Sequence, residues 1–130
     1  MPVFESTEKM YEVLGALFNH LMEHPDVREK FQAAGITVRF EINDPKGEIW
    51  LSPEDGVICG PCEHTPTVTM TLSGDSCHKF WKKELSLPVA LAKRQIKSRG
   101  PINKILKLLP LLKPAYEAYP EIAKKRGIEA

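Results

Sequence analysis

The sequence predicts an α+β protein in which amphipathic helices at both ends of the chain flank a group of short strands. From Met10 to Met22 the apolar residues recur at three- and four-residue spacing, which is the period of one helix face. In several segments between positions 36 and 72 apolar and polar residues alternate instead, which is the period of a strand with one buried face. With 130 residues the chain has the size of one domain, so we expect 1–130 to form a single domain.

The N-terminal helix can begin at Ser6 or Thr7, because both residue types cap helices well. We expect it to end at His24, since a proline follows and pushes the residue before it out of the helical region. A second short helix is predicted over 26–33, and Gly35 should stop it.

The strands of the first half are predicted at 36–43, 48–51, 57–59 and 67–72. Asp-Pro-Lys-Gly separates the first pair and Pro-Glu-Asp-Gly separates the next, and both are turn sequences that favour hairpins. In the last of these strands Val68, Met70 and Leu72 should point inward and the threonines outward.

The second half of the chain is predicted to be mostly helical. Ser73 can cap a helix that carries Cys77, Phe80 and Trp81 on one side. A short helix is expected over 88–93, because proline is favoured in a first turn. The remaining elements are a polar, edge-type strand over 95–100 and helices over 102–109 and 115–126.

The composition is that of a folded globular protein, with 42% hydrophobic and 27% charged residues. No secretory signal is visible, and no apolar segment reaches the roughly 20 residues needed to cross a bilayer. Three cysteines are an odd number, which argues against a secreted disulfide framework and favours a cytoplasmic location.

Charge is distributed unevenly along the chain. Residues 1–65 contain 5 Lys and Arg against 12 Asp and Glu, whereas residues 66–130 contain 13 against 5. A basic half can indicate nucleic acid or an anionic membrane as a partner, but acidic and basic segments can also pack side by side and neutralise each other. We favour neutralisation and expect no nucleic-acid partner.

The order of these elements and several local phrases resemble the sterol carrier protein type 2 family over most of the chain. Residues 66–73, Pro-Thr-Val-Thr-Met-Thr-Leu-Ser, are similar to that family's T-x-T strand. Residues 83–91 resemble its G-x-L-x-P-x-x-A turn and short helix, with Glu84 where a glycine is common. Residues 96–100 and 105–109 resemble its hydrophobic-K-x-x-G strand and Leu-rich closing helix.

The resemblance implies a five-stranded mixed sheet covered on one face by helices, with a hydrophobic tunnel between them. Members of the family bind sterols, fatty acids, acyl-CoAs and phospholipids, and bacterial relatives hold isoprenoid quinone intermediates. It therefore implies a carrier without catalytic residues or cofactors that binds a lipid or another elongated lipophilic ligand. An alternative is an interaction module that presents such a ligand to a partner enzyme.

Apolar residues of the predicted elements are candidates for the walls of a ligand pocket, since each buried methylene contributes ~0.8 kcal/mol. Any one of them can equally be an ordinary core residue. The candidates are Phe18, Leu21 and Met22 in the first helix, Phe40 and Met70 in the strands, Phe80 and Trp81 in the aromatic helix, and Ile102, Ile105, Leu106 and Leu109 near the C-terminus.

The helix predicted over 102–109 would place its four candidates on one face and its lysines on the other, so it could close a pocket. Pro110 and Pro114 are expected to break the helix, which would supply a hinge. The segment can equally be an ordinary packing helix. Lysines and arginines in and around it also predict transient contact with an anionic membrane surface.

Cys59-Gly60-Pro61-Cys62 matches the redox motif of thioredoxins, which makes a thiol-disulfide oxidoreductase the enzyme alternative. In that chemistry the first cysteine lies at a helix N-terminus, whereas here a strand is predicted to follow. Cys59, Cys62 and His64 could bind a metal, but a closed structural zinc site takes four ligands. We favour structural thiols without a metal, with a regulatory disulfide and metal binding as alternatives.

Overall fold

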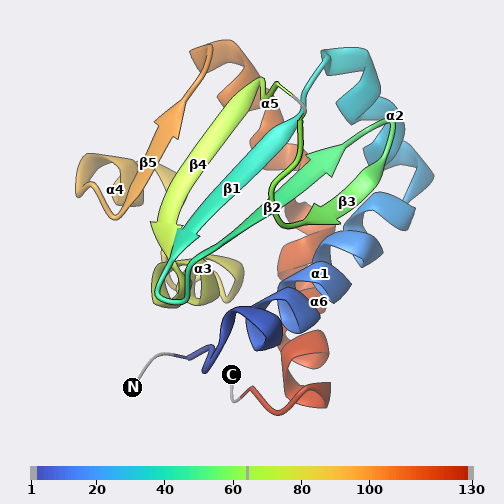
Figure 1. The fold of residues 1–130 in the computed structure, drawn as a ribbon. Helices are drawn as coiled ribbons and strands as arrows, with labels where there is room; N and C mark the ends of the chain where they lie inside the picture. The colour runs from blue at the N-terminus through green and yellow to red at the C-terminus, as the bar shows by residue number, and fades with distance from the viewer. Residues whose placement is uncertain (1–2, 64, 129–130) are drawn as a thin grey trace.

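The computed structural model describes residues 3–63 and 65–128, except for the side chains of Ile102 and Leu109. Within these residues the chain forms a five-stranded sheet and six helices (Figure 1). The strands are β1 (Val38–Asn43), β2 (Gly47–Ser52), β3 (Gly56–Cys59), β4 (Val68–Ser73) and β5 (Ile96–Arg99). The helices are α1 (Thr7–Glu23), α2 (Pro25–Ala34), α3 (Gly74–Trp81), α4 (Leu87–Ala92), α5 (Ile102–Leu111) and α6 (Lys113–Lys125).

The sheet is mixed, with the strand order β3-β2-β1-β4-β5. The first three strands form an antiparallel meander joined by the two predicted turns. β4 pairs in parallel with β1, so the chain has to cross β2 and β1 between β3 and β4. β5 then pairs antiparallel with β4 at the far edge. The predicted α+β fold with a five-stranded mixed sheet is confirmed.

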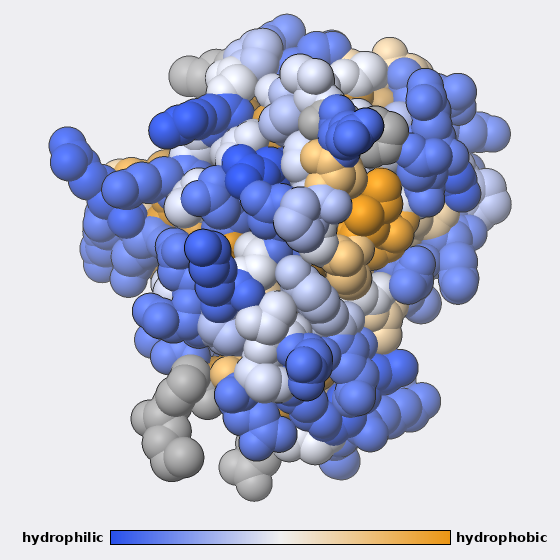
Figure 2. Space-filling view, in the orientation of Figure 1, coloured by the Kyte–Doolittle hydropathy of each residue, from blue (hydrophilic) through white to orange (hydrophobic). Residues whose placement is uncertain are grey.

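The helices α1, α5 and α6 lie behind the sheet in Figure 1, and the core lies between them and the strands. In β1 the side chains of Val38, Phe40 and Ile42 are buried on this inner face. Arg39 and Glu41 alternate with them on the outer face, as the period of two requires. Figure 2 shows the outer face as mainly hydrophilic, with an apolar area over β2 and β3.

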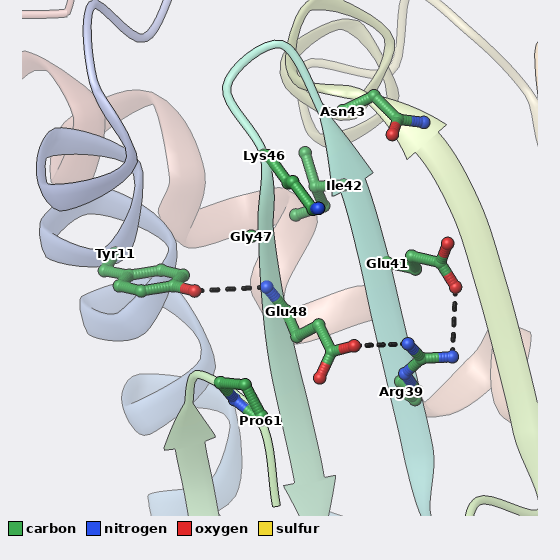
Figure 3. A pocket seen from close by; sticks show the side chains of 9 residues that line it. All are labelled: Tyr11, Arg39, Glu41, Ile42, Asn43, Lys46, Gly47, Glu48 and Pro61. Atoms are coloured by element: carbon green, nitrogen blue, oxygen red, sulfur yellow. Dashed lines mark hydrogen bonds and ion pairs between the residues drawn. The ribbon is translucent and has the colours of Figure 1, made fainter.

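Helix α1 packs across the end of the meander and is fixed at both ends. Ser6 caps it by accepting a hydrogen bond from the backbone N–H of Lys9, as predicted. Near its start, the Tyr11 hydroxyl accepts a hydrogen bond of 3.1 Å from the backbone N–H of Glu48 in β2 (Figure 3). Gly60 still donates to the carbonyl of Glu48 at 2.7 Å, but its φ of 112° turns the chain away, so Tyr11 replaces the next strand residue.

The predicted element boundaries agree with the structure within two residues, which is the usual uncertainty of helix and strand ends. The break predicted at Pro110 is wrong, because α5 continues through this residue to Leu111. Pro114 lies in the first turn of α6, where its missing N–H costs no hydrogen bond. Only Leu112 separates the two helices, so the structure provides a tight corner in place of the predicted two-proline hinge.

The predicted apolar face of α5 also needs correction. Ile105 and Leu108 are buried, whereas Leu106 is 61% exposed. Apolar residues occur on more than one side of this segment, so helical periodicity alone could not determine which side faces the core.

No helix in the described part of the chain is both long enough and apolar enough to cross a membrane.

Candidate functional site

Three aromatic rings from three different elements meet between the sheet and the helices. Phe18 of α1 stacks on Phe40 of β1, with ring centroids 5.0 Å apart and planes 14° from parallel. Trp81 of α3 packs edge-on against Phe18 at 5.5 Å and lies 6.4 Å from Phe40. The structure therefore brings together three of the candidate residues, in the offset and edge-to-face arrangements that aromatic pairs favour.

The aromatic cluster reaches the molecular surface through Phe80 and Tyr116. Phe80 and Trp81 are adjacent on α3, so their side chains diverge, and the two rings still contact edge-on at 4.9 Å. Tyr116 of α6 lies 5.3 Å from Phe80 and 5.4 Å from Trp81. Burial raises the pKa of Tyr116 to about 12, so its hydroxyl is neutral at physiological pH. Sequence reasoning missed Tyr116, although its place in a predicted helix three residues before Tyr119 was a usable signal.

A surface pocket of about 290 Å³ opens beside these last two rings. Its walls come from the end of α3, the start of α4, the chain between them, and α6. They are formed by Phe80, Lys83, Leu85, Ser86, Leu87, Pro88 and Tyr116. The pocket ends at Phe80 and Tyr116, whose rings contact Trp81 of the buried cluster. The apolar pocket and the aromatic cluster behind it together form the candidate site.

The remaining predicted wall residues lie elsewhere in the fold. Leu21, Met70 and Ile105 are buried in the common core. Met22 lines a different, polar hollow beside Arg28, and Leu106 faces outward. The side chains of Ile102 and Leu109 fall outside the described residues.

A second pocket, of about 410 Å³, lies over the β1–β2 hairpin, and both charged and apolar side chains line it (Figure 3). Arg39 is paired with Glu48 and, at 3.0 Å, with Glu41, and its guanidinium carbon lies 5.9 Å from the centre of the Trp50 ring. The hydrogen bond to Glu48 raises the pKa of Arg39. An apolar chain in this pocket would remove water from these charged side chains, and that desolvation cost makes it a weaker candidate for an apolar ligand.

The cysteine motif lies at the end of an edge strand. Cys59 is the last residue of β3, and its sulfur lies 3.4 Å from where a Cβ atom would be at Gly15 of α1. Burial raises the pKa of Cys59, whereas a redox-active thiol at a helix N-terminus has a lowered pKa. The next element after the motif is a strand, β4. Burial also raises the pKa of Cys77, to about 12, so both thiols stay protonated at neutral pH.

Among residues 3–63 and 65–128, no group of three or more His, Cys, Asp and Glu side chains is arranged to hold a metal ion. The metal alternative used Cys59, Cys62 and His64, and His64 lies outside the described residues.

Comparison with solved structures finds the same fold in several proteins. The sterol carrier protein domain 2 of Helicoverpa armigera matches with a TM-score of 0.68 and 20% identity, over 84% of this chain and 89% of that one. The ubiquinone synthesis protein UbiJ-SCP2 matches with a TM-score of 0.60 and 18% identity, over 79% and 94%. Sterol carrier protein 2 of Aedes aegypti, in complex with the C16 fatty acid palmitate, matches with a TM-score of 0.56 and 14% identity, over 82% and 96%.

Sequence comparison gives the family. No curated protein matches the chain. The family model described as the SCP-2 sterol transfer family matches residues 18–113, which include every strand, the complete aromatic helix α3 and the C-terminal part of α1. The chain therefore belongs to the SCP-2 sterol transfer family.

Proposed function

We propose that this protein is a non-catalytic carrier that binds one elongated lipophilic molecule between its sheet and its helices. The observation that carries the proposal is the continuity of the aromatic cluster. Rings run from Phe18 and Phe40 in the core through Trp81 to Phe80 and Tyr116 at the surface pocket. Such a path offers an apolar chain a protected environment that begins at the surface and leads inward.

The family and its structural neighbours support this proposal. The Aedes aegypti protein holds palmitate, and UbiJ-SCP2 is described as a ubiquinone synthesis protein. Both names concern molecules with long apolar chains. A role in presenting the ligand to a partner enzyme is the second form of the same proposal.

The predicted hydrophobic tunnel is part of the proposal. Aromatic rings occupy the space where the chain of a ligand would lie, so entry requires Trp81 and Tyr116 to change rotamer. Each buried methylene contributes ~0.8 kcal/mol, so a chain of about twelve methylenes contributes roughly 10 kcal/mol toward the cost of moving these rings out of their packed positions.

Binding of a fluorescent fatty acid tests the proposal. We expect one saturable site per chain, displacement by unlabelled lipid, and retained lipid in native mass spectra of the purified protein. Leu85→Gln, in the half-buried pocket wall, should weaken binding about tenfold, because it removes more than 1 kcal/mol of apolar contact. Val89→Gln is the matched control, since Val89 is 46% exposed on α4 and does not line the pocket. An absence of saturable binding by the wild-type protein would refute the carrier.

We further propose that the carrier unloads at anionic membranes. Residues 85–116 contain seven Lys and Arg and no Asp or Glu. The exposed large hydrophobic residues of the described chain, Val89 and Leu106, both lie in this segment. Cations beside exposed apolar side chains suit an anionic bilayer surface, where each cation contributes ~1 kcal/mol.

A further inference from the structure

We propose that the surface pocket selects an amphiphile with an anionic head, a carboxylate or a phosphate, and that Lys83 and Ser86 bind that head. This inference rests on the proposed carrier function and specifies its ligand. The other five residues of the pocket lining are two aromatic rings, two leucines and a proline. A cation and a hydroxyl among apolar walls form the pattern of a site that holds one polar end of an apolar ligand.

Lys83 has no ion-pair partner among the described residues. Its neighbour Lys82 is paired with Glu84, at 2.6 Å between Nζ and Oε2. The acid closest in sequence is therefore engaged by another lysine, whereas Lys83 is exposed and lines the pocket. An anionic ligand head would be its first charged partner within the described residues.

Ser86 is also uncommitted. It occupies the N-cap position of α4, where serine usually accepts a hydrogen bond from the helix backbone, but its side chain makes no capping bond. Ser73, at the start of α3, does cap its helix. The Ser86 hydroxyl is therefore available to donate a hydrogen bond to an oxygen of the ligand.

The backbone holds Lys83 in position at a cost. Its φ is 66°, in the left-handed region, where a residue with a side chain is less stable than glycine. The turn that ends α3 imposes this conformation, because the N–H of Lys83 donates to Phe80 and the N–H of Glu84 donates to Lys79. Glycine would fit the turn without strain, whereas lysine adds a positive charge at the pocket.

Tyr116 lines the same pocket, and its hydroxyl is neutral. An uncharged sterol could bond to a hydroxyl but would gain nothing from the charge of Lys83, which would stay hydrated. A carboxylate or phosphate can accept from the ammonium and from a hydroxyl together, and charge-assisted hydrogen bonds of this kind are about twice as strong as neutral ones. The geometry thus favours fatty acids and phosphate-bearing lipids over neutral ones.

The test compares two probes that differ only at the carboxyl end, dansylaminoundecanoic acid, which is anionic, and its neutral methyl ester. Lys83→Asn removes the cation and keeps a residue that tolerates positive φ, so it should fold at least as stably as wild type. We expect it to bind the acid about tenfold more weakly, the equivalent of 1.4 kcal/mol, and the ester within twofold of wild type. Ser86→Ala should weaken the acid probe by a smaller factor.

Lys93→Asn is the matched control, because Lys93 is an exposed cation at the end of α4 that does not line the pocket. Dodecanoate and dodecyl phosphate then compete with the acid probe for the wild-type protein. The stronger competitor shows whether the pocket prefers a carboxylate or a phosphate head. Equal losses of both probes in Lys83→Asn, or an equal loss of the acid in Lys93→Asn, would overturn the selection of an anionic head while leaving the carrier intact. If wild type bound neither probe, the proposed function itself would fail.

Discussion

The Nδ1 atom of His78 in α3 lies 2.6 Å from the hydroxyl oxygen of Tyr119 in α6, and this buried hydrogen bond ties the two helices together. Burial, reinforced by the charge of Lys82, lowers the pKa of His78, while Glu84 and Asp75 oppose the shift. Burial raises the pKa of Tyr119, so the phenol keeps its proton. The bond therefore joins a neutral imidazole and a neutral phenol.

We expect this pair to make the stability of the protein fall in mild acid. The folded state resists protonation of His78, whereas the unfolded chain takes up the proton near pH 6.5. The stability that His78 contributes to the folded state is therefore complete above about pH 6.5 and decreases as the pH falls below that value. Urea unfolding at pH 7.5 and pH 5.5 measures the effect. His78→Gln should remove part of the pH dependence, and His20→Gln, on the exposed side of α1, should retain it. If the free energy of unfolding changed equally with pH in both variants, the pH dependence could not be assigned to His78.

Glycine at position 100 should be required by the fold. Its φ is 128°, and a Cβ atom there would lie 2.4 Å from the carbonyl oxygen of Thr67. We expect Gly100→Ala to destabilise the protein by about 2 to 4 kcal/mol, because both the backbone and the strand β4 would have to move. Gly127→Ala is the control, since φ is 80° but nothing lies within 4 Å of its added Cβ, and it should cost about 1 kcal/mol. Thermal unfolding measures the loss of stability in each variant, and equal losses in the two would be inconsistent with the steric argument.

The thiols of Cys59 and Cys62 should be dispensable for binding. Because burial raises the pKa of Cys59, its alkylation by iodoacetamide should be slow at pH 7 and accelerate only in alkali. Replacing both cysteines by serine should leave fatty-acid affinity within twofold and the melting temperature nearly unchanged. Turnover of a disulfide substrate by the wild type, or a stoichiometric zinc ion removed by a chelator, would restore the redox or metal alternative.

Transfer of a fluorescent lipid should be faster to anionic than to neutral vesicles and should slow as salt is added. The attraction is between exposed charges, whose screening length falls from about 10 Å at 0.1 M to about 3 Å at 1 M salt. Lys104 is unsuitable for testing membrane docking by mutation, because its ammonium group donates a hydrogen bond to the carbonyl of Ala34 in α2. Lys107→Glu with Lys113→Glu should slow the transfer several-fold, since both residues are exposed.

Lys30→Glu with Lys46→Glu provides the same change in net charge at two exposed sites in the acidic half of the chain. This pair should leave transfer to anionic vesicles less affected than the pair near α5. Identical rates to both vesicle types at low salt would rule out docking and would leave the pocket untouched.

The spacing of apolar and polar residues along the chain was sufficient to predict most of the fold. The alternation in β1 determined which side chains are buried, since a strand with one buried face allows a single register. In β4 the alternation correctly predicted that Val68, Met70 and Leu72 are buried, but Thr69 is buried as well. In α5 the same reasoning failed at Leu106, because a segment that is apolar on several sides fits the core in more than one rotation. The helix break predicted at Pro110 was also wrong, since the last turn of α5 accommodates this proline.

The candidate site was only partly predictable. Phe18, Phe40, Phe80 and Trp81 could be selected as apolar residues on buried faces, but their mutual contact depends on how α1 and α3 cross the sheet. Lys83 and Ser86 belong to the site only because α3 ends in a left-handed turn and α4 starts without a side-chain cap. Neither property is visible in residue spacing.

The hydrogen bond from Glu48 to Tyr11 has a consequence for self-association (Figure 3). Where β3 turns away, β2 would present an unpaired N–H to solvent, and such an edge is a template for a strand of another molecule. The hydroxyl of Tyr11 accepts the hydrogen bond from that N–H, so a strand of a neighbouring molecule cannot pair with it. At the opposite edge, the exposed Lys97 and Arg99 supply the charge that discourages strand addition. Tyr11→Phe should therefore leave the fold in place while making concentrated solutions more prone to form fibrils.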